Sequence, residues 1–164
     1  MNPFDLTGRT AVVTGGGRGL GLGISRSLIA AGADVIVLSR GEVPDDLVAH
    51  AREHSRAVSG VRVDLADPRS IDQAADQVLA RGTVDVLVNN AGTQVRHPAA
   101  EFPLDEWDAV LQVNLRAVLQ LWQAFGRSML ERRDGKIVNL ASLLSFQGGL
   151  TVPAYAARDR KSVV

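Results

Sequence analysis

The chain has 164 residues and no cysteine, and its 18 Lys and Arg residues balance 18 Asp and Glu residues, so the formal net charge is zero. The lack of cysteine excludes a disulfide framework and a thiolate nucleophile. The balanced charge gives no electrostatic basis for binding nucleic acid or an anionic membrane surface. With 46% hydrophobic residues, the composition is that of one ordinary globular domain.

Targeting segments and metal sites are not indicated either. The N-terminus lacks a basic start followed by an apolar run, and no stretch of 18 apolar residues occurs in the sequence. We therefore expect a cytoplasmic protein without a signal peptide or a membrane span. The three histidines, His50, His54 and His97, are scattered along the chain, and we expect no metal site from them.

Short apolar runs alternate along the chain with longer helical patterns. The expected strands are 10–14, 34–38, 58–63, 84–88 and 136–140, and the expected helices are 20–31, 44–54, 68–81 and 104–133. Near-continuous apolar runs are typical of strands that are covered on both faces. The alternation predicts a parallel sheet with right-handed crossovers, which is a doubly wound α/β fold of the Rossmann type.

Glycine is concentrated in the turn between the first strand and the first helix. Six of the 16 glycines fall in residues 15–23, and residues 14–21 read T-G-G-G-R-G-L-G. Missing side chains in such a turn allow backbone N–H groups and the positive end of the helix to approach a pyrophosphate. A tight connection without a ligand is the alternative, because the strict G-x-G-x-x-G spacing is absent.

Several further motifs follow at spacings that, with the glycine turn, resemble the short-chain dehydrogenase/reductase family up to about Ala157. They are Asp64-Leu65 after the third strand, Asn89-Asn90-Ala91-Gly92 after the fourth, and Asn114, Ser142 and Tyr155. The resemblance implies that the glycine turn holds the dinucleotide phosphates, that Asp64 and Leu65 lie at the adenine, and that the Asn89–Gly92 segment lines the cofactor. The implied cofactor residues are Thr14, Gly15, Arg18, Gly19, Leu20, Gly21, Ser39, Arg40, Asp64, Leu65, Asn90, Ala91 and Gly92. Singly, Asn89-Asn90 could be a strand-ending turn and Asp64 a helix cap.

The end of the second strand bears on the choice between NAD and NADP. NAD selectivity usually needs a carboxylate there, whereas NADP needs a cation for its 2′-phosphate. The available residues are Leu38, Ser39 and Arg40, and Arg18 in the glycine turn is a second cation. Guanidinium groups suit phosphate, so we expect NAD or NADP with a preference for NADP. Two solvated loop arginines are the alternative.

The resemblance also implies a catalytic group. Ser142 would hold a substrate carbonyl, Tyr155 would act as the acid or base, and Asn114 would anchor a water in the proton relay. A tyrosine has a reference pKa near ~10, so the family places a Lys four residues later, one helical turn along the same face. This sequence has Asp159 there. Lys161 lies about 120° away around a helix, so the tetrad is incomplete.

The end of the chain departs from the family pattern. Members of the family are longer, as α/β domains commonly run to about 250 residues. We therefore interpret residues 1–157 as an incomplete dinucleotide-binding domain, truncated after the fifth strand. Residues 158–164, RDRKSVV, resemble one reading frame of a sequencing-library adapter and are interpreted as a non-native tail. A genuine truncated paralogue is the alternative.

Within the family, residues 137–155 look closest to members that act on sugar acids. Such a substrate needs a cation for its carboxylate and hydrogen-bonding groups for its hydroxyls, and Arg96 and Gln147 are the candidates. The implied reaction is hydride transfer between nicotinamide and a keto or hydroxy group of a sugar acid such as 2-keto-3-deoxygluconate. A 3-oxoacyl thioester reductase and a non-catalytic dinucleotide-binding remnant are the alternatives. We expect this chain to be inactive and its intact homologue to be a homo-oligomer.

Overall fold

The computed structural model describes residues 4–147 and 149–161. Its centre is a parallel five-stranded sheet in the order β3-β2-β1-β4-β5. The strands are β1 (Thr10–Thr14), β2 (Asp34–Ser39), β3 (Val58–Arg62), β4 (Val86–Asn89) and β5 (Lys136–Asn139). The predicted doubly wound α/β fold is confirmed, and each strand lies within two residues of its expected limits.

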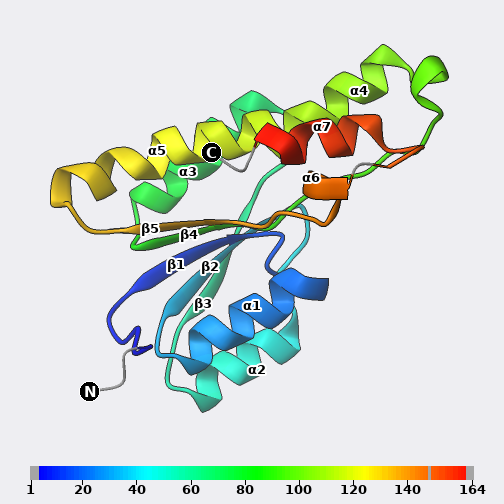
Figure 1. The fold of residues 1–164 in the computed structure, drawn as a ribbon. Coiled ribbons are helices and arrows are strands. Elements are labelled where there is room, and N and C mark those ends of the chain that lie inside the picture. Colours follow the sequence, from blue (N-terminus) through cyan, green and yellow to red (C-terminus); the bar gives the residue numbers. More distant parts are fainter. Residues whose placement is uncertain (1–3, 148, 162–164) are drawn as a thin grey trace.

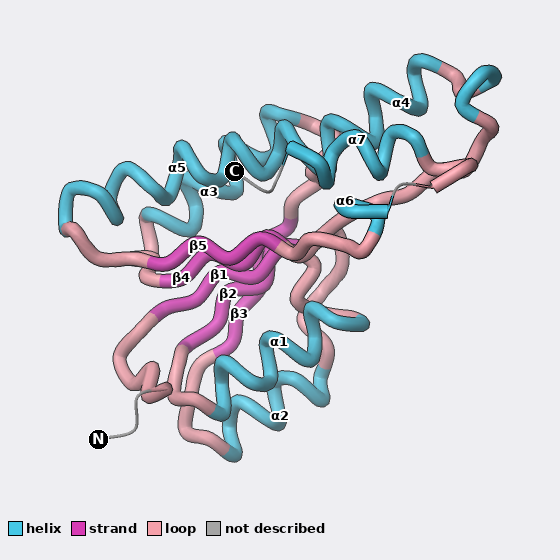
Figure 2. The backbone as a smooth tube through the Cα atoms, viewed as in Figure 1, coloured by secondary structure: helices cyan, strands magenta, loops and turns pink. Residues whose placement is uncertain are grey.

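Helices cover both faces of this sheet (Figures 1 and 2). They are α1 (Gly19–Ala30), α2 (Asp45–Glu53), α3 (Pro68–Leu79), α4 (Leu104–Leu111), α5 (Ala117–Arg132), α6 (Leu144–Gln147) and α7 (Pro153–Lys161), with a 3₁₀ turn over Ala99–Glu101. One face carries α1 and α2, and the other carries α3 and α5. Among the described residues, no helix is both long and apolar enough to cross a membrane.

Alternation along the strands divides the core into two layers. In β1, Val12 packs with α3 and α5, whereas its neighbours Ala11 and Val13 pack with α1 and α2. All three side chains are fully buried. Because successive side chains of a strand point to opposite faces, a continuous apolar run builds both layers at once.

The expected helix over residues 104–133 is interrupted. Between α4 and α5 the chain forms a π-helical segment, Gln112–Arg116, in which the backbone is wider than an α-helix. A single π-type turn of this kind is frequent at functional sites. The apolar stripe is present, because Val110, Leu121 and Phe125 are all buried, but hydrophobic spacing could not show the wider turn.

The expectation that every strand is covered on both faces is wrong for β5. Among the described strands it pairs with β4 alone, and so it forms an edge of the sheet. Ile137 and Val138 are 37% and 48% exposed, so an apolar strand lies open at this edge. The sequence pattern of β5 matches that of a buried strand, but α5 covers it only in part, at the point where Trp122 donates to the side chain of Asn139 at 3.2 Å.

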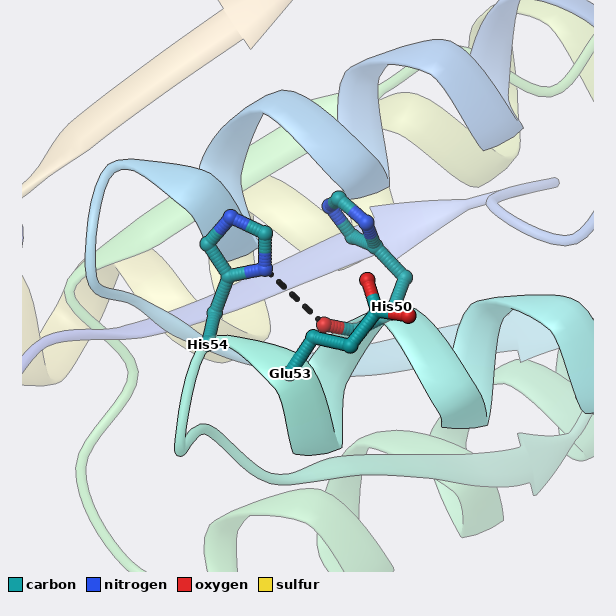
Figure 3. A group of neighbouring side chains, drawn as sticks. All are labelled: His50, Glu53 and His54. Atoms are coloured by element: carbon teal, nitrogen blue, oxygen red, sulfur yellow. Dashed lines mark hydrogen bonds between the residues drawn. The ribbon is translucent and has the colours of Figure 1, made fainter.

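Two of the three histidines lie closer together than their description as scattered suggests. His50 and His54 lie one turn apart at the C-terminal end of α2, with ring centroids 4.4 Å apart. The carboxylate of Glu53 lies beside them (Figure 3). Residues three and four apart share one face of a helix, so His50 meets Glu53 and His54 on one side of α2.

Candidate active site

A cleft of about 540 Å³ opens where β1, β2, β3 and β4 end. The sheet order reverses direction at β1, between β2 and β4, and parallel α/β sheets bind ligands at such a point. Eight of the predicted cofactor residues line the cleft: Gly15, Arg18, Ser39, Arg40, Asp64, Leu65, Ala91 and Gly92. Four separate strand ends thus contribute predicted residues to one cavity.

The glycine turn has the close approaches that its sequence predicts. Gly15 has a φ of +65°, which is in the left-handed region. A Cβ on Gly21 would lie 2.2 Å from the carbonyl oxygen of Gly15 and 2.5 Å from the amide nitrogen of Asn90. The turn therefore packs directly on the first turn of α1.

No described side chain caps the N-terminus of α1. Its N-cap residue, Arg18, makes no side-chain cap hydrogen bond, and the first turn holds no acidic residue. The first N–H groups of a helix have no partner within the helix, and together with the helix dipole they favour an anion. This end of α1 therefore suits a phosphate group.

Thr14 fastens the ends of β1 and β4 together below the cleft. Its buried hydroxyl accepts hydrogen bonds from the N–H groups of Asn90 and Ala91 at 3.0 and 2.9 Å. The side-chain amide of Asn90 in turn donates to the carbonyl of Thr14 at 2.9 Å. These contacts make Thr14 and Asn90 a brace for the glycine turn.

Five predicted cofactor residues do not line the cleft. They are Thr14, Gly19, Leu20, Gly21 and Asn90. Four of them shape the turn or brace it from beneath, whereas Leu20 is 77% exposed and lines a separate apolar groove with Phe4 and Ile24. The sequence motif identifies the glycine turn as a whole. It does not show which of its residues line the cleft and which hold the turn in place from beneath.

Charged groups of both signs lie at the β2 end of the cleft. Arg18 and Arg40 both line it, as the phosphate argument expects, and the Ser39 hydroxyl there donates to the carbonyl of Gly41 at 2.8 Å. Glu42 also lines the cleft and was missed in the sequence. Glu42 lies three residues after β2 ends at Ser39, beyond the residues that the NAD and NADP argument considered.

Asp64, after the end of β3, and an apolar wall complete the lining of the cleft. The Asp64 carboxylate accepts a hydrogen bond from the N–H of Ala66 at 3.0 Å, which closes a local turn. The wall was also missed in the sequence and comprises Val63, Val95, Ala109, Val110 and Val113. Its members come from three distant segments, so no local pattern unites them.

Asn114 is buried in the π-helical segment and holds the loop after β4. Its side-chain oxygen accepts from the N–H of Thr93 at 2.8 Å, and its amide donates to the carbonyl of Thr93 at 2.7 Å. Thr93 itself lines the cleft. The structure thus places Asn114 directly behind the cleft wall.

Ser142 and Tyr155 lie on neighbouring elements at the same end of the sheet. Ser142 precedes α6 and accepts from the N–H of Leu144 at 3.2 Å. Tyr155 lies on α7, which packs against α6, α4 and the π-helical segment that holds Asn114. The packing therefore gathers the three predicted catalytic residues in one region.

The two predicted substrate residues lie outside the cleft, and part of the predicted tail lies outside the described residues. Arg96 and Gln147 are both exposed, and neither lines the cleft. A hydrogen bond of 3.0 Å from the N–H of His97 to the carbonyl of Thr151 brings the loop of Arg96 to the start of α7. The side chains of residues 158–161 and all of residues 162–164 lie outside the described part, which includes the side chains of Asp159 and Lys161.

Comparison with known proteins gives one family. The family model described as short chain dehydrogenase matches residues 9–158. The 2-dehydro-3-deoxy-D-gluconate 5-dehydrogenase of Bacillus subtilis is 44% identical over 154 residues, which are 94% of this chain and 61% of that protein. The chain thus spans less than two thirds of this curated relative.

Two solved structures share the fold closely. A Beutenbergia cavernae protein, provisionally named an NAD(P) dependent gluconate 5-dehydrogenase and solved with bound NADP at low occupancy, is 43% identical with a TM-score of 0.92, over 99% of this chain and 65% of its own. A gluconate 5-dehydrogenase from Burkholderia cenocepacia, in complex with NADP and tartrate, is 36% identical with a TM-score of 0.86, over 97% of this chain and 63% of its own.

Proposed function

Because this chain belongs to the short chain dehydrogenase family, we propose that it forms the cofactor-binding part of an NAD(P)-dependent oxidoreductase that acts on a sugar acid. The observation that carries the proposal is the single cleft at the strand ends. It brings together the glycine turn, two arginines and residues from β3 and β4.

The residues present fit a dinucleotide. Gly15 and Gly17 leave the floor of the cleft without side chains, and the uncapped end of α1 adjoins it, so backbone N–H groups are available to a pyrophosphate. Asp64, Leu65 and the apolar wall would hold the adenine. When bound, the dinucleotide supplies or accepts the hydride.

Arg18 and Arg40 favour NADP over NAD. Both guanidinium groups line the cleft near the end of β2, where they would pair with a 2′-phosphate. Glu42 opposes this preference, because its carboxylate lines the same region and could accept hydrogen bonds from a ribose. The two cations outnumber this one carboxylate, and the structures from B. cavernae and B. cenocepacia hold NADP.

Titration of the chain with NADPH and NADH tests this preference. We expect tighter binding of NADPH, and we expect Arg40→Ala to weaken NADPH binding at least tenfold while NADH binding changes little. Glu42→Gln is the matched control, since it removes a charge from the same loop and should not weaken NADPH. Equal or tighter binding of NADH by the unaltered chain would overturn the preference.

Three side chains would handle the proton and the carbonyl. Ser142 would donate a hydrogen bond to the substrate oxygen, and Tyr155 would donate the proton that converts the alkoxide to an alcohol. Asn114, with its amide bonded to Thr93, would fix the loop beside the nicotinamide and would anchor a water through its helix. These roles rest on the family motif.

A sugar acid is the proposed substrate class. The relative from B. subtilis is named for a deoxygluconate, and Arg96 and Gln147 could serve a carboxylate and hydroxyls. A substrate panel on a full-length homologue tests the class. We expect turnover of keto-hexonates, and a preference for 3-oxoacyl thioesters would reject the sugar-acid assignment in favour of an acyl reductase.

The 164-residue chain itself we propose to be inactive. Asp159 occupies the place of the family Lys, and a carboxylate does not favour the ionised form of a tyrosine one turn away. Purified chain with NADPH and 2-keto-3-deoxygluconate should show dinucleotide binding without turnover. Measurable reduction of the keto acid would overturn this proposal, whereas absence of binding would overturn the cofactor assignment.

A further inference from the structure

The C-terminal end of α2 carries three potential metal ligands on one face. They are His50, Glu53 and His54, and one ligand atom from each lies within 4.8 Å of those of the other two. Figure 3 shows both rings rising from the end of α2 toward α1. The spacing of three and four residues brings them to the same side of the helix.

Backbone hydrogen bonds orient both imidazole rings. Nε2 of His50 lies 3.1 Å from the carbonyl oxygen of Arg26 on α1, and Nδ1 of His54 lies 3.0 Å from the carbonyl oxygen of His50. A carbonyl can only accept, so these two ring nitrogens donate. Whenever a ring is neutral, its other nitrogen has a lone pair to offer, which is Nδ1 in His50 and Nε2 in His54.

This arrangement matches the surroundings of histidines that bind metals. Such a histidine almost always donates its second ring N–H to a carbonyl or a carboxylate, which orients the ring and selects the tautomer. Here both carbonyls are in place in the described structure. This leaves Nδ1 of His50 free to ligate. In Figure 3 the His54 nitrogen nearer to Glu53 and His50 is the one that donates to the carbonyl of His50, so the His54 ring must turn or release this hydrogen bond to ligate an ion.

The charge of the site and access to it also suit a cation. The carboxylate of Glu53 is exposed and supplies a negative charge, and the nearby guanidinium of Arg26 is already paired with Asp46. His54 is exposed and His50 is half-buried, so an ion could enter from solvent.

We propose that His50, Glu53 and His54 bind one Zn²⁺ ion, with water in the fourth position. Two imidazoles and one carboxylate form a ligand set that zinc takes in a tetrahedral site, whereas Ca²⁺ and Mg²⁺ prefer sets made of oxygen. In the sequence H-A-R-E-H over residues 50–54, the two histidines stand four positions apart, as they do in the H-x-x-E-H metal motif. The glutamate of such helical zinc motifs acts as a general base, so Glu53 would be a ligand here for its position alone.

The role of the ion follows from its place in the fold. α2 connects two neighbouring parallel strands, β2 and β3, so it runs in the opposite direction to them. Its C-terminal end therefore lies where the strands begin, whereas the cleft lies where they end. The ion is therefore too far away to take part in chemistry in the cleft. It fastens the last turn of α2 and strengthens the hydrogen bond from His50 to α1, so it stabilises the fold.

Zinc titration of the metal-stripped chain tests the site. The full 164-residue chain is fused to a soluble carrier without a histidine tag, and binding of ZnCl₂ is measured by calorimetry against the carrier alone. We expect one ion per chain. We expect His50→Ala, Glu53→Gln and His54→Ala each to weaken binding at least as much as the 10–100-fold loss that follows removal of an outer-shell partner.

His97→Ala is the matched control, because it also removes one histidine, but one that contacts Glu106 at 3.0 Å and lies outside the cluster. It should bind zinc as the unaltered chain does. X-ray absorption of the zinc-loaded chain should show two imidazole nitrogens and a carboxylate oxygen at about 2.0–2.2 Å. Zinc should also raise the melting midpoint of the unaltered chain, and not that of the His50→Ala/His54→Ala variant.

Three results would overturn the site. They are no zinc binding above that of the carrier, unweakened binding by the His50→Ala/His54→Ala variant, and equal weakening by His97→Ala. Circular dichroism of each variant checks its fold. Glu53→Gln keeps the size of an exposed side chain, so the comparison holds even if an alanine variant unfolds.

Discussion

Gly21 shows how a single missing side chain sets the shape of the cofactor turn. Its Cα faces the carbonyl oxygen of Gly15 so closely that a Cβ would lie 2.2 Å from that oxygen. Backbone atoms cannot rotate away as a flexible side chain can. The requirement for glycine at this position is therefore steric.

Gly21→Ala should destabilise the chain by about 1–3 kcal/mol, the cost of forcing extra atoms into a packed region, and should abolish NADPH binding. Urea unfolding and a dinucleotide titration measure the two effects. Gly23→Ala is the control in the same helix, because no atom lies within 4 Å of its added Cβ, and it should stabilise α1 by about 0.5–1 kcal/mol. A Gly21→Ala variant that is as stable as Gly23→Ala would contradict this view of the turn.

The ion pair between Asp134 and Arg9 makes the stability of the fold depend on pH. A hydrogen bond from the guanidinium of Arg9 lowers the pKa of Asp134 below the ordinary value of 3.8. A carboxylate with a lowered pKa in the folded state stabilises the fold above its unfolded pKa and loses that contribution as the pH falls. The ion pair is half exposed, so salt should weaken the effect.

Asp134→Asn should therefore flatten the loss of stability on acidification below about pH 4. Unfolding free energies measured in urea between pH 5 and pH 2.5 test this, at low and high salt. Asp108→Asn, an exposed change outside this ion pair, is the control and should leave the profile unchanged. The same acid-induced loss in Asp134→Asn as in the unaltered chain would contradict the role of the pair.

At the scale of elements, one hydroxyl links the end of β1 to the segment that follows β4, beyond the pairing of the two strands. Thr14 accepts two backbone hydrogen bonds from residues that follow β4. These N–H groups have no hydroxyl to reach if Thr14 becomes valine, which has nearly the same shape. Each buried donor that loses its partner costs about 1–3 kcal/mol.

Thr14→Val should thus lower the free energy of unfolding by more than about 1 kcal/mol, and it should loosen the glycine turn enough to weaken NADPH binding. Thr14→Ser retains the hydroxyl and should keep most of the stability, which makes it the control. Denaturant unfolding and amide exchange at Asn90 and Ala91 are the measurements. Protected amides in Thr14→Val would show that other groups make this join.

The interrupted helix shows what pattern analysis misses at this scale. The apolar spacing of residues 104–133 is continuous, and α4 and α5 share one buried stripe. The π-helical segment arises at Asn114, whose amide is bonded to both backbone groups of Thr93. That contact joins residues 21 positions apart, so helix periodicity carries no sign of it.

At the scale of the whole molecule, the β5 edge is the exposed feature. Ile137 and Val138 are 37% and 48% exposed along a strand that pairs on one side only. An apolar strand edge of this kind is a template for pairing with another chain. The chain also spans only 61% of its B. subtilis relative.

Val138→Glu should reduce self-association of the chain, since a charge on an edge strand opposes pairing. Light scattering and sedimentation over a range of concentrations measure this. Leu104→Glu is the control, because it adds the same charge at a 79% exposed position on α4, away from the sheet edge. Equal loss of association in both variants would point to net charge, and not to the edge, as the cause.

The sequence by itself determined the strands, the helices, the parallel α/β class and the glycine turn. These depend on local periodicity and on steric rules that act over a few residues. The tertiary structure decided that Glu42 enters the cleft and that Val63, Val95 and Val110 meet in one wall. Each of these follows from the packing of elements and from the angular position of side chains, which a linear pattern does not contain.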